Sequence, residues 1–210
     1  MKQRQNVVLG FLGSVLDVGR GPDRWESWRP TISVCRQADL LVHRFELLYS
    51  IKQKTLAELI KRDIQTVSPE TEVHLHNIEF TDPWDFEEVY AKLFDFTRAY
   101  SFNDAANYLV HITTGTHVAQ ICLFLLTESK WIPGQLLQTS PEKDRSAAGE
   151  IKIIDLDLAR YDSIATRFRQ QREDSVSFLK DGIETRNKPF NKLMDRIEKI
   201  AGATRDPILL

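Results

Sequence analysis

The sequence has few glycines, prolines and cysteines, and neither sign of charge is in large excess. Nine glycines and eight prolines among 210 residues, with 42% hydrophobic and 28% charged residues, are typical of a folded chain. A formal net charge of −2 argues against broad, non-specific binding to a nucleic-acid duplex, which needs a large excess of lysine and arginine. Any contact with nucleic acid is therefore expected to be local.

The sequence also lacks disulfide, metal and membrane signals. Cys35 and Cys122 lie in apolar runs without C-x-x-C spacing, so we predict buried free thiols and a reducing, cytoplasmic setting. His74 and His76 could chelate a metal formally, but without other ligands nearby they favour a solvent-facing strand. The apolar segment after the N-terminal MKQRQ spans about eight residues, too short for a signal peptide or a membrane span.

Apolar runs and amphipathic segments alternate over the first 140 residues. This alternation predicts a Rossmann-like α/β domain with a mostly parallel central sheet and helices on both faces. A chain of this length most naturally forms one main domain. The expected strands are 7–13, 72–80, 108–113 and 135–139, and the expected helices are 52–67, 82–100 and 116–130.

Two regions between these elements are less regular. Residues 14–30 contain glycines, prolines, arginines and tryptophans and indicate a long loop. Residues 31–35 and 44–49 favour short strands around a polar turn, a candidate hairpin. Before the helix at 82–100, Asp82 is expected to cap the first turn and Pro83 to occupy its first position.

The composition changes after residue 140. A polar stretch leads to a candidate edge strand at 151–158, a charged helix at about 160–180 and a linker at 181–189. A last amphipathic helix, 190–200, precedes GATRDPILL, which predicts a strand at the end of the chain. We therefore expect the sequence to be the first part of a longer protein.

Two segments are candidates for ligand contact, because ligands of open parallel sheets bind at the carboxyl ends of the strands. The first is Gly13 and Ser14 with the loop behind them. The second is the turn at 113–117, where Gly115 allows close backbone approach, threonine hydroxyls can contact a phosphate and His117 can donate a proton. Alternatively, a threonine of this turn only caps the helix that follows.

The loop also contains side chains suited to single-stranded RNA. Arg20, Arg24 and Arg29 supply positive charge, and Trp25 and Trp28 supply stacking surfaces. The alternative is a loop pinned to the core by its tryptophans, with the arginines in solvent. The sequence leaves both interpretations open.

The segment HITTGTHVAQI, residues 111–121, resembles the strand-Thr-Gly-Gly-Thr-Lys-helix signature of CRISPR-associated Rossmann fold (CARF) domains. Ser14 falls where that family places Ser or Thr after its first strand. The resemblance implies a homodimeric sensor of cyclic oligoadenylates or related RNA-derived signals. The sequence differs from the signature at Thr114, which replaces the first glycine of the pair, and at His117, which replaces the lysine.

A resemblance over the whole chain is more specific. The segments GFLGSVLDVGRGPDRWESWRPT, SPETEV, DPWDFEEVY and HITTGTHVAQICLFLLTE are similar to bacterial enhancer-binding activators of an operon encoding the RNA ligase RtcB and the RNA cyclase RtcA. The resemblance implies a CARF sensor domain at 1–182, with a linker and the start of an AAA+ ATPase domain at 183–210. It also implies that the signal is RNA with a 2′,3′-cyclic phosphate end, such as cleaved tRNA, or a ligand related to cyclic oligoadenylate.

The same resemblance implies partners for the longer protein. These are a second copy of the chain, its own AAA+ domain, promoter DNA, the sigma-54 RNA polymerase, and RtcA or RtcB. ATP and Mg²⁺ belong to the AAA+ domain, because this chain has no G-x-x-x-x-G-K-[ST] motif, and no cofactor is expected in it.

The sequence leaves two hypotheses about the function open. In the first, the domain is a non-enzymatic sensor whose dimer changes arrangement on ligand binding and releases the ATPase from inhibition. In the second, it is a nuclease that cuts its oligonucleotide ligand, with His117 as the acid or base. A nicotinamide or flavin enzyme is disfavoured because no G-x-G-x-x-G follows the first strand. We favour the sensor, whose expected ligand-binding residues are Gly13, Ser14, Arg20, Arg24, Trp28, Arg29, Thr113, Thr114, Gly115, Thr116, His117 and Gln120.

Overall fold

The computed structural model describes residues 4–19, 21–141, 148–154 and 192. The chain divides after residue 156 into two units, and every strand and helix below belongs to the first. The expected strand at 151–158 is described only as far as residue 154. The expected helix at 160–180, the linker and the final helix and strand lie outside the described residues, apart from residue 192.

Six strands form one sheet in the order β3-β2-β1-β4-β5-β6. Strands β1 to β5 are mutually parallel, and β6 pairs with β5 in the antiparallel direction. The carboxyl ends of five strands therefore meet at one edge of the sheet. The strands are β1 (Gln5–Phe11), β2 (Arg44–Tyr49), β3 (Glu72–Asn77), β4 (Ala106–His111), β5 (Gly134–Ser140) and β6 (Glu150–Ile154).

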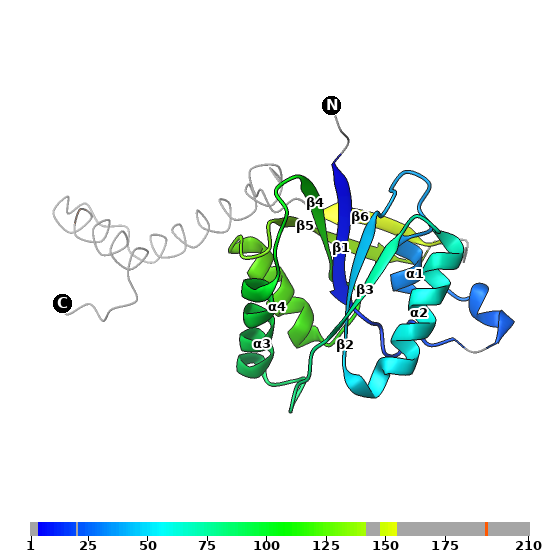
Figure 1. The fold of residues 1–210 in the computed structure, drawn as a ribbon. Coiled ribbons are helices and arrows are strands. Elements are labelled where there is room, and N and C mark those ends of the chain that lie inside the picture. The colour runs from blue at the N-terminus through cyan, green and yellow to red at the C-terminus, as the bar shows by residue number, and fades with distance from the viewer. Residues whose placement is uncertain (1–3, 20, 142–147, 155–191, 193–210) are drawn as a thin grey trace. The chain divides into compact units, whose positions relative to one another are not determined.

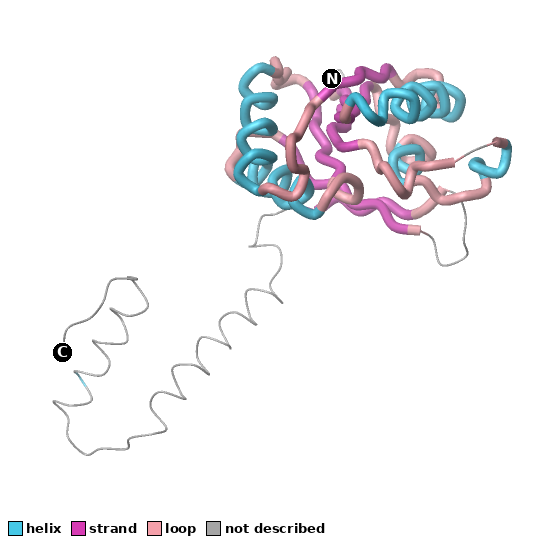
Figure 2. Tube along the Cα trace, turned by 90° about the horizontal axis from the view of Figure 1, so that it is seen from below, coloured by secondary structure: helices cyan, strands magenta, loops and turns pink. Residues whose placement is uncertain are grey.

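Helices cover both faces of the sheet (Figure 1). One face packs against α1 and α2, and the other packs against α3 and α4. Figure 2 shows the helices in cyan on opposite sides of the strands in magenta. The helices are α1 (Pro30–Val34), α2 (Lys54–Val67), α3 (Phe86–Ala99) and α4 (His117–Glu128), with short 3-10 turns η1 (Pro22–Trp25) and η2 (Ile51–Gln53).

Successive residues of β1 point into two separate cores. Val8 packs with Phe45 and Ile60 under α1 and α2, whereas Leu9 packs with Leu123 under α4. Because side chains alternate along a strand, a strand buried on both faces must be apolar throughout. The unbroken apolar run of β1 therefore follows from its central place in the sheet.

The predicted Rossmann-like fold, with a mostly parallel sheet and helices on both faces, is confirmed. Both cysteines are buried free thiols, as expected, and burial raises the pKa of Cys35 to about 12. In the part of the chain that the structure describes, no helix is long and apolar enough to cross a membrane.

The expectation of a hairpin at 31–49 is wrong. Strand β2 is parallel to both β1 and β3, and residues 30–34 form the helix α1. Pro30 begins this helix, and the carboxylate of Asp17 accepts hydrogen bonds from the backbone N–H (3.0 Å) and hydroxyl (2.5 Å) of Thr31. A contact between residues 14 positions apart thus fixes a segment whose β-branched residues favour a strand.

The start of α3 also differs from its prediction. Asp85, not Asp82, caps the helix, because its side chain accepts a hydrogen bond from the N–H of Glu88 at 2.8 Å. Asp82 instead accepts from the N–H of Trp84 at 2.9 Å. Pro83 consequently lies in the loop before the helix, not in its first turn.

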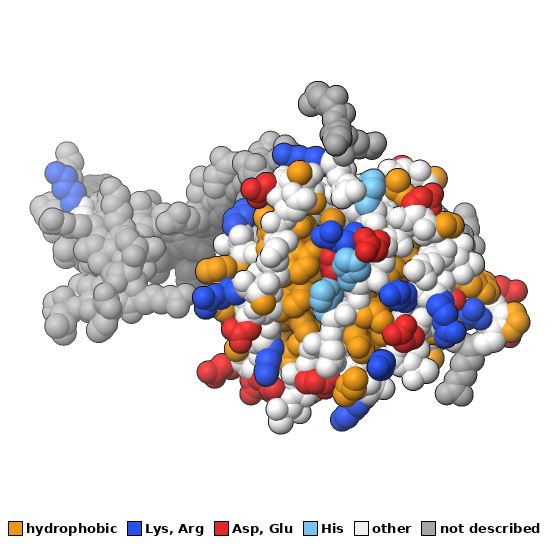
Figure 3. Space-filling model, viewed as in Figure 1, with side chains coloured by type: hydrophobic (Ala, Val, Ile, Leu, Met, Phe, Trp, Pro, Cys, Tyr) orange, Lys and Arg blue, Asp and Glu red, His pale blue; other side chains and the backbone are white. Residues whose placement is uncertain are grey.

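Charged side chains of β2 and β3 gather near the middle of one surface, bordered by hydrophobic ones (Figure 3). Buried Glu46 lies 2.6 Å from both His76 Nε2 and Arg44 Nε, and it accepts a hydrogen bond from the Tyr100 hydroxyl at 2.6 Å. Burial alone would raise the pKa of Glu46, but these partners hold it at about 2. His74 and His76 thus contact the buried carboxylate of Glu46 and are also accessible to solvent. The alternation of residues in the sequence did not predict the contact with Glu46.

Candidate ligand-binding site

A pocket of about 490 Å³ lies at the carboxyl ends of β1 to β4. Its volume is within the range that takes a small organic ligand. One wall is the turn at 115–117 that starts α4, and another is Ser14 in the loop after β1. The remaining walls come from the segments after β2 and β3, residues 50–53 and 78–84.

The glycine in the turn has a backbone conformation that few other residues adopt. Gly115 has φ of +90°, and a Cβ there would lie 3.1 Å from the Cβ of Phe11. Thr116 then caps α4, because its hydroxyl accepts from the N–H of Ala119 at 3.1 Å. This backbone places His117 in the first helical turn with an exposed side chain that lines the pocket.

The two threonines before Gly115 point into the protein. Thr114 is buried and donates to the carbonyl of Phe11 at 2.5 Å, which ties this turn to the end of β1. Thr113 donates to the carbonyl of Thr139 and accepts from its N–H, which ties the turn to β5. Both hydroxyls therefore hold the turn in place, and neither residue lines the pocket.

His111 supports the turn from below. It is fully buried at the end of β4, with Nε2 3.0 Å from the Thr139 hydroxyl and Nδ1 3.4 Å from the Thr114 hydroxyl. Burial lowers its pKa to about 3, so it is neutral at physiological pH. Gly10 makes room for it, because a Cβ there would lie 2.8 Å from the Cβ of His111.

The loop after β1 is anchored by a buried carboxylate. Asp17 accepts hydrogen bonds from the N–H of Gly13 (2.7 Å) and from the backbone and hydroxyl of Thr31. Burial raises its pKa, which these hydrogen bonds partly oppose. A Cβ on Gly13 would lie 2.6 Å from Asp17 Oδ2, so this close approach requires glycine. Gly13 thus shapes the loop and does not line the pocket.

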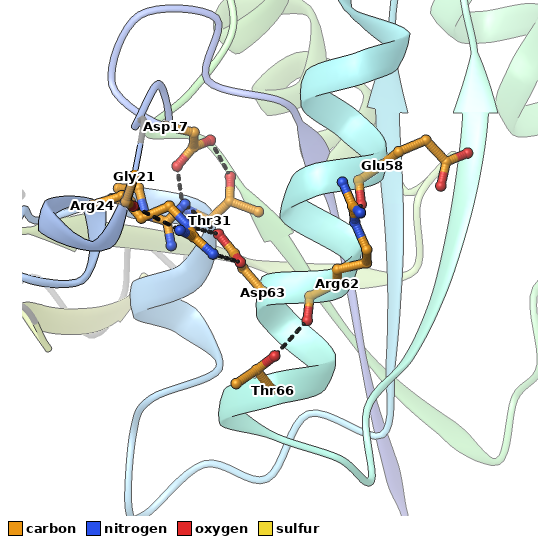
Figure 4. Close-up of polar contacts among 9 residues, drawn as sticks. Asp17, Gly21, Arg24, Thr31, Glu58, Arg62, Asp63 and Thr66 are labelled. Atoms are coloured by element: carbon orange, nitrogen blue, oxygen red, sulfur yellow. Dashed lines mark hydrogen bonds and ion pairs between the residues drawn. The ribbon is translucent and has the colours of Figure 1, made fainter.

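Two loop arginines, Arg24 and Arg29, converge on Asp63 of α2. Figure 4 shows the contact between Arg24 and Asp63. Arg29 is buried and donates to Asp63 Oδ2 at 2.7 Å, and Arg24 donates to both carboxylate oxygens at 3.0 Å. Both guanidiniums also lie over the ring of Trp25. This arrangement favours a loop held to α2 over a loop presenting free arginines.

Two further predicted residues, Trp28 and Gln120, are not part of the pocket lining. Trp28 is partly buried against Gly149, and Gln120 donates to the Gly115 carbonyl at 3.2 Å. Arg20 lies outside the described residues. Of the predicted ligand-binding set, the pocket therefore brings together Ser14, Gly115, Thr116 and His117.

Sequence reasoning missed half of the pocket wall. Lys52 follows β2, and Thr81 and Trp84 follow β3, all at the edge where parallel strands end. The rule that located Ser14 would have found all three. Lys52 was missed because the expected hairpin left β2 out of the parallel sheet, and the segment after the strand expected at 72–80 was interpreted only as the start of a helix. Lys52 is the one lysine in the lining, and Glu79 its one carboxylate.

The lining carries hydroxyls, one lysine, one carboxylate, a histidine and aromatic rings. The hydroxyls and the lysine suit an anionic group of an organic ligand, and the rings suit a flat, apolar part. No cluster of three or more His, Cys, Asp or Glu side chains that could hold a metal ion occurs among the described residues.

Comparison with known proteins identifies a family. The RtcR family, regulator of RNA terminal phosphate cyclase, matches residues 4–182. The transcriptional regulatory protein RtcR of Escherichia coli (strain K12) is 52% identical over 99% of this chain. The chain spans 40% of that relative's length.

Two solved structures resemble this chain at low sequence identity. Csm6 of Enterococcus italicus, bound to cyclic hexa-2′-fluoro-hexa-dAMP, superposes with a TM-score of 0.56 at 13% identity, over 92% of this chain and 53% of its own. Can2 of Sulfobacillus thermosulfidooxidans, in complex with cyclic tetra-adenylate, has a TM-score of 0.46 at 14% identity, over 70% of this chain and 36% of its own. The Csm6 match supports the assignment of the fold.

Proposed function

Because the chain belongs to the RtcR family of regulators, we propose that it is the sensor part of a transcription activator and that its pocket binds an RNA-derived ligand. The observation that carries this proposal is the pocket itself. Ser14 and the turn at 115–117, which the resemblance to CARF domains singled out, lie on its walls together.

The chemistry of the pocket fits a nucleotide. Lys52 supplies a positive charge, and the threonine turn supplies a helix N-terminus, where phosphate oxygens are favoured. The ligand is an RNA end with a 2′,3′-cyclic phosphate or a molecule related to cyclic oligoadenylate. Because the pocket is of small-ligand size, one nucleotide enters it and the rest of a longer RNA lies outside.

The ligand-sensing unit is a homodimer. Helix α4 has an exposed apolar side that continues from His117 through Ile121, 51% exposed, and Phe124, 37% exposed. His117, Ile121 and Phe124 are spaced by four and by three residues, so they lie on one side of the helix. Pairing of two α4 helices would bury these side chains. It would also bring two His117 side chains, and hence two pockets, toward one axis.

Coupling to transcription runs through the longer protein. Residues 1–182 are the sensor domain, and residues 183–210 are the linker and the start of an AAA+ ATPase domain, which would use ATP and Mg²⁺. Ligand binding favours one dimer arrangement over another and relieves inhibition of the ATPase. The activator then acts on the sigma-54 RNA polymerase at promoter DNA and switches on the RNA-repair genes that encode RtcA and RtcB, in the cytoplasm.

Deleting the sensor from the full-length protein tests this function. A repressive sensor predicts transcription of the target operon without any signal once residues 1–182 are removed. Loss of transcription after the deletion would contradict the repressive role. Reporter output with and without RNA damage, at matched protein levels, measures the difference.

A turnover assay separates the sensor from the nuclease. The purified chain is incubated with labelled cyclic tetraadenylate and with RNA ending in a 2′,3′-cyclic phosphate. The sensor predicts binding without cleavage. Cleavage that is lost in His117→Ala would instead support an enzyme, because an exposed histidine in the pocket is a suitable acid or base.

A further inference from the structure

Trp84 is a large apolar side chain held in the pocket wall with 62% of its surface exposed. The other tryptophans are engaged by neighbours. Trp131 packs edge-on against Phe94 at 4.7 Å, and Trp25 lies under arginine guanidiniums. Among the described residues, no ring or cation contacts the Trp84 indole in this way. An indole left exposed in a pocket wall forgoes the stabilisation that burial provides.

The loop that carries Trp84 is firmly fixed. The carboxylate of Glu88 accepts hydrogen bonds from the N–H of Thr81 at 2.6 Å and of Asp82 at 2.9 Å. Asp82 in turn accepts from the N–H of Trp84, and Asp85 accepts from the N–H of Glu88. Four hydrogen bonds within eight residues leave this loop little freedom, so the position of the tryptophan backbone is set before a ligand arrives.

The same loop is joined to the neighbouring wall, the turn that begins α4. The Thr116 hydroxyl donates to the carbonyl of Pro83, the residue before Trp84, at 3.1 Å. This contact holds the tryptophan loop beside the turn that begins α4. A ligand with a phosphate at the helix N-terminus therefore has an aromatic surface within one nucleotide's reach.

We propose that Trp84 is the stacking platform for the nucleobase of the bound nucleotide and that Glu88 positions it. This inference rests on the proposed function and deepens it, because it assigns recognition of a base to one wall and of the phosphate to the other. Stacking on an indole contributes to affinity without hydrogen bonds to the base edge, so the platform accepts any of the four bases.

A double-mutant cycle tests the platform in the full chain. The probe is a five-nucleotide RNA ending in a 2′,3′-cyclic phosphate, with or without the base of its last nucleotide. We expect Trp84→Ala to raise the Kd of the intact probe roughly 5- to 150-fold and Trp84→Phe to raise it much less. Removing the base should weaken binding to the wild type but not to Trp84→Ala.

Matched variants separate the platform from other roles. Trp131→Ala removes an exposed tryptophan outside the pocket lining and should leave the Kd unchanged. Glu88→Gln should weaken binding of the intact probe more than of the base-free probe, whereas Glu87→Gln, at the neighbouring exposed position, should change neither. Circular dichroism and the dimer fraction are measured for each variant.

The outcomes are distinct. If the wild type discriminates between the probes and Trp84→Ala discriminates equally, the platform is overturned while the proposed pocket stands. If Trp84→Ala changes the dimer fraction and not the base discrimination, Trp84 is a protein contact and the platform is again overturned. If the wild type binds neither this probe nor cyclic tetraadenylate, the proposed function fails and the platform with it.

Discussion

At the scale of single residues, Asp63 determines where the loop after β1 lies. Its carboxylate is 3% exposed and is the shared partner of Arg29 and Arg24. The hydrogen bonds and positive charge of these arginines hold the pKa of Asp63 below its usual value, although burial alone would raise it. The sequence showed arginines suited to RNA, and no local pattern could indicate that an aspartate 34 residues away from Arg29 binds them.

Removing this carboxylate should destabilise the domain. Asp63→Asn leaves the buried guanidinium of Arg29 without a charged partner, so we expect the free energy of unfolding to fall by about 3–5 kcal/mol. Urea unfolding monitored by tryptophan fluorescence measures the change. Arg24→Ala, which removes the more exposed partner, should cost much less, and equal losses in the two variants would contradict this account.

At the scale of elements, the predictable parts of the fold are those whose pattern is local. The apolar run of β1 and the amphipathic periodicity of α2 were visible in the sequence. In both elements the pattern of buried residues lies within the element itself, so it can be recognised without knowledge of the rest of the fold. Helix α1 was missed because its conformation depends on Asp17, which lies in another segment. The pocket was half predicted for a related reason, since Lys52 becomes a neighbour of the turn only once β2 is placed in the parallel sheet. Trp84 was missed because its segment was interpreted only as the start of a helix.

His111, the last residue of β4, should make the stability of the domain depend on pH. Burial lowers the folded-state pKa of His111 to about 3 from an ordinary value of 6.5. The unfolded chain therefore takes up a proton below pH 6.5 that the folded chain does not. This stabilisation is complete above pH 6.5 and is lost as the pH falls toward 3.

Urea unfolding at pH 7.5, 6.0 and 5.0 measures this dependence. We expect the free energy of unfolding to decrease along the series in the wild type and to decrease less steeply in His111→Asn. Parallel curves for the two proteins would show that His111 is not the group responsible.

At the scale of the whole molecule, the exposed side of α4 should be the contact between two copies. Ile121→Glu places a charge at the centre of that surface and should shift the protein from dimer to monomer. Light scattering coupled to size-exclusion chromatography gives the mass. Leu41→Glu, a change at a similarly exposed leucine between α1 and β2, should leave the dimer intact. A monomeric wild type, or a dimeric Ile121→Glu, would argue against this interface.

The central claim is that the pocket at the carboxyl ends of β1 to β4 binds an anionic, RNA-derived ligand. Lys52 lines this pocket, whereas Lys54, two residues along and also exposed, does not. Lys52→Glu and Lys54→Glu therefore make the same change in net charge, and only the first places a negative charge beside the ligand.

The most direct measurement is the affinity of the wild type and these two variants for RNA ending in a 2′,3′-cyclic phosphate and for cyclic tetraadenylate. We predict saturable binding of at least one of them, weakened roughly 10-fold or more by Lys52→Glu and unchanged by Lys54→Glu. No binding by the wild type, or equal affinities of the two variants, would contradict the account.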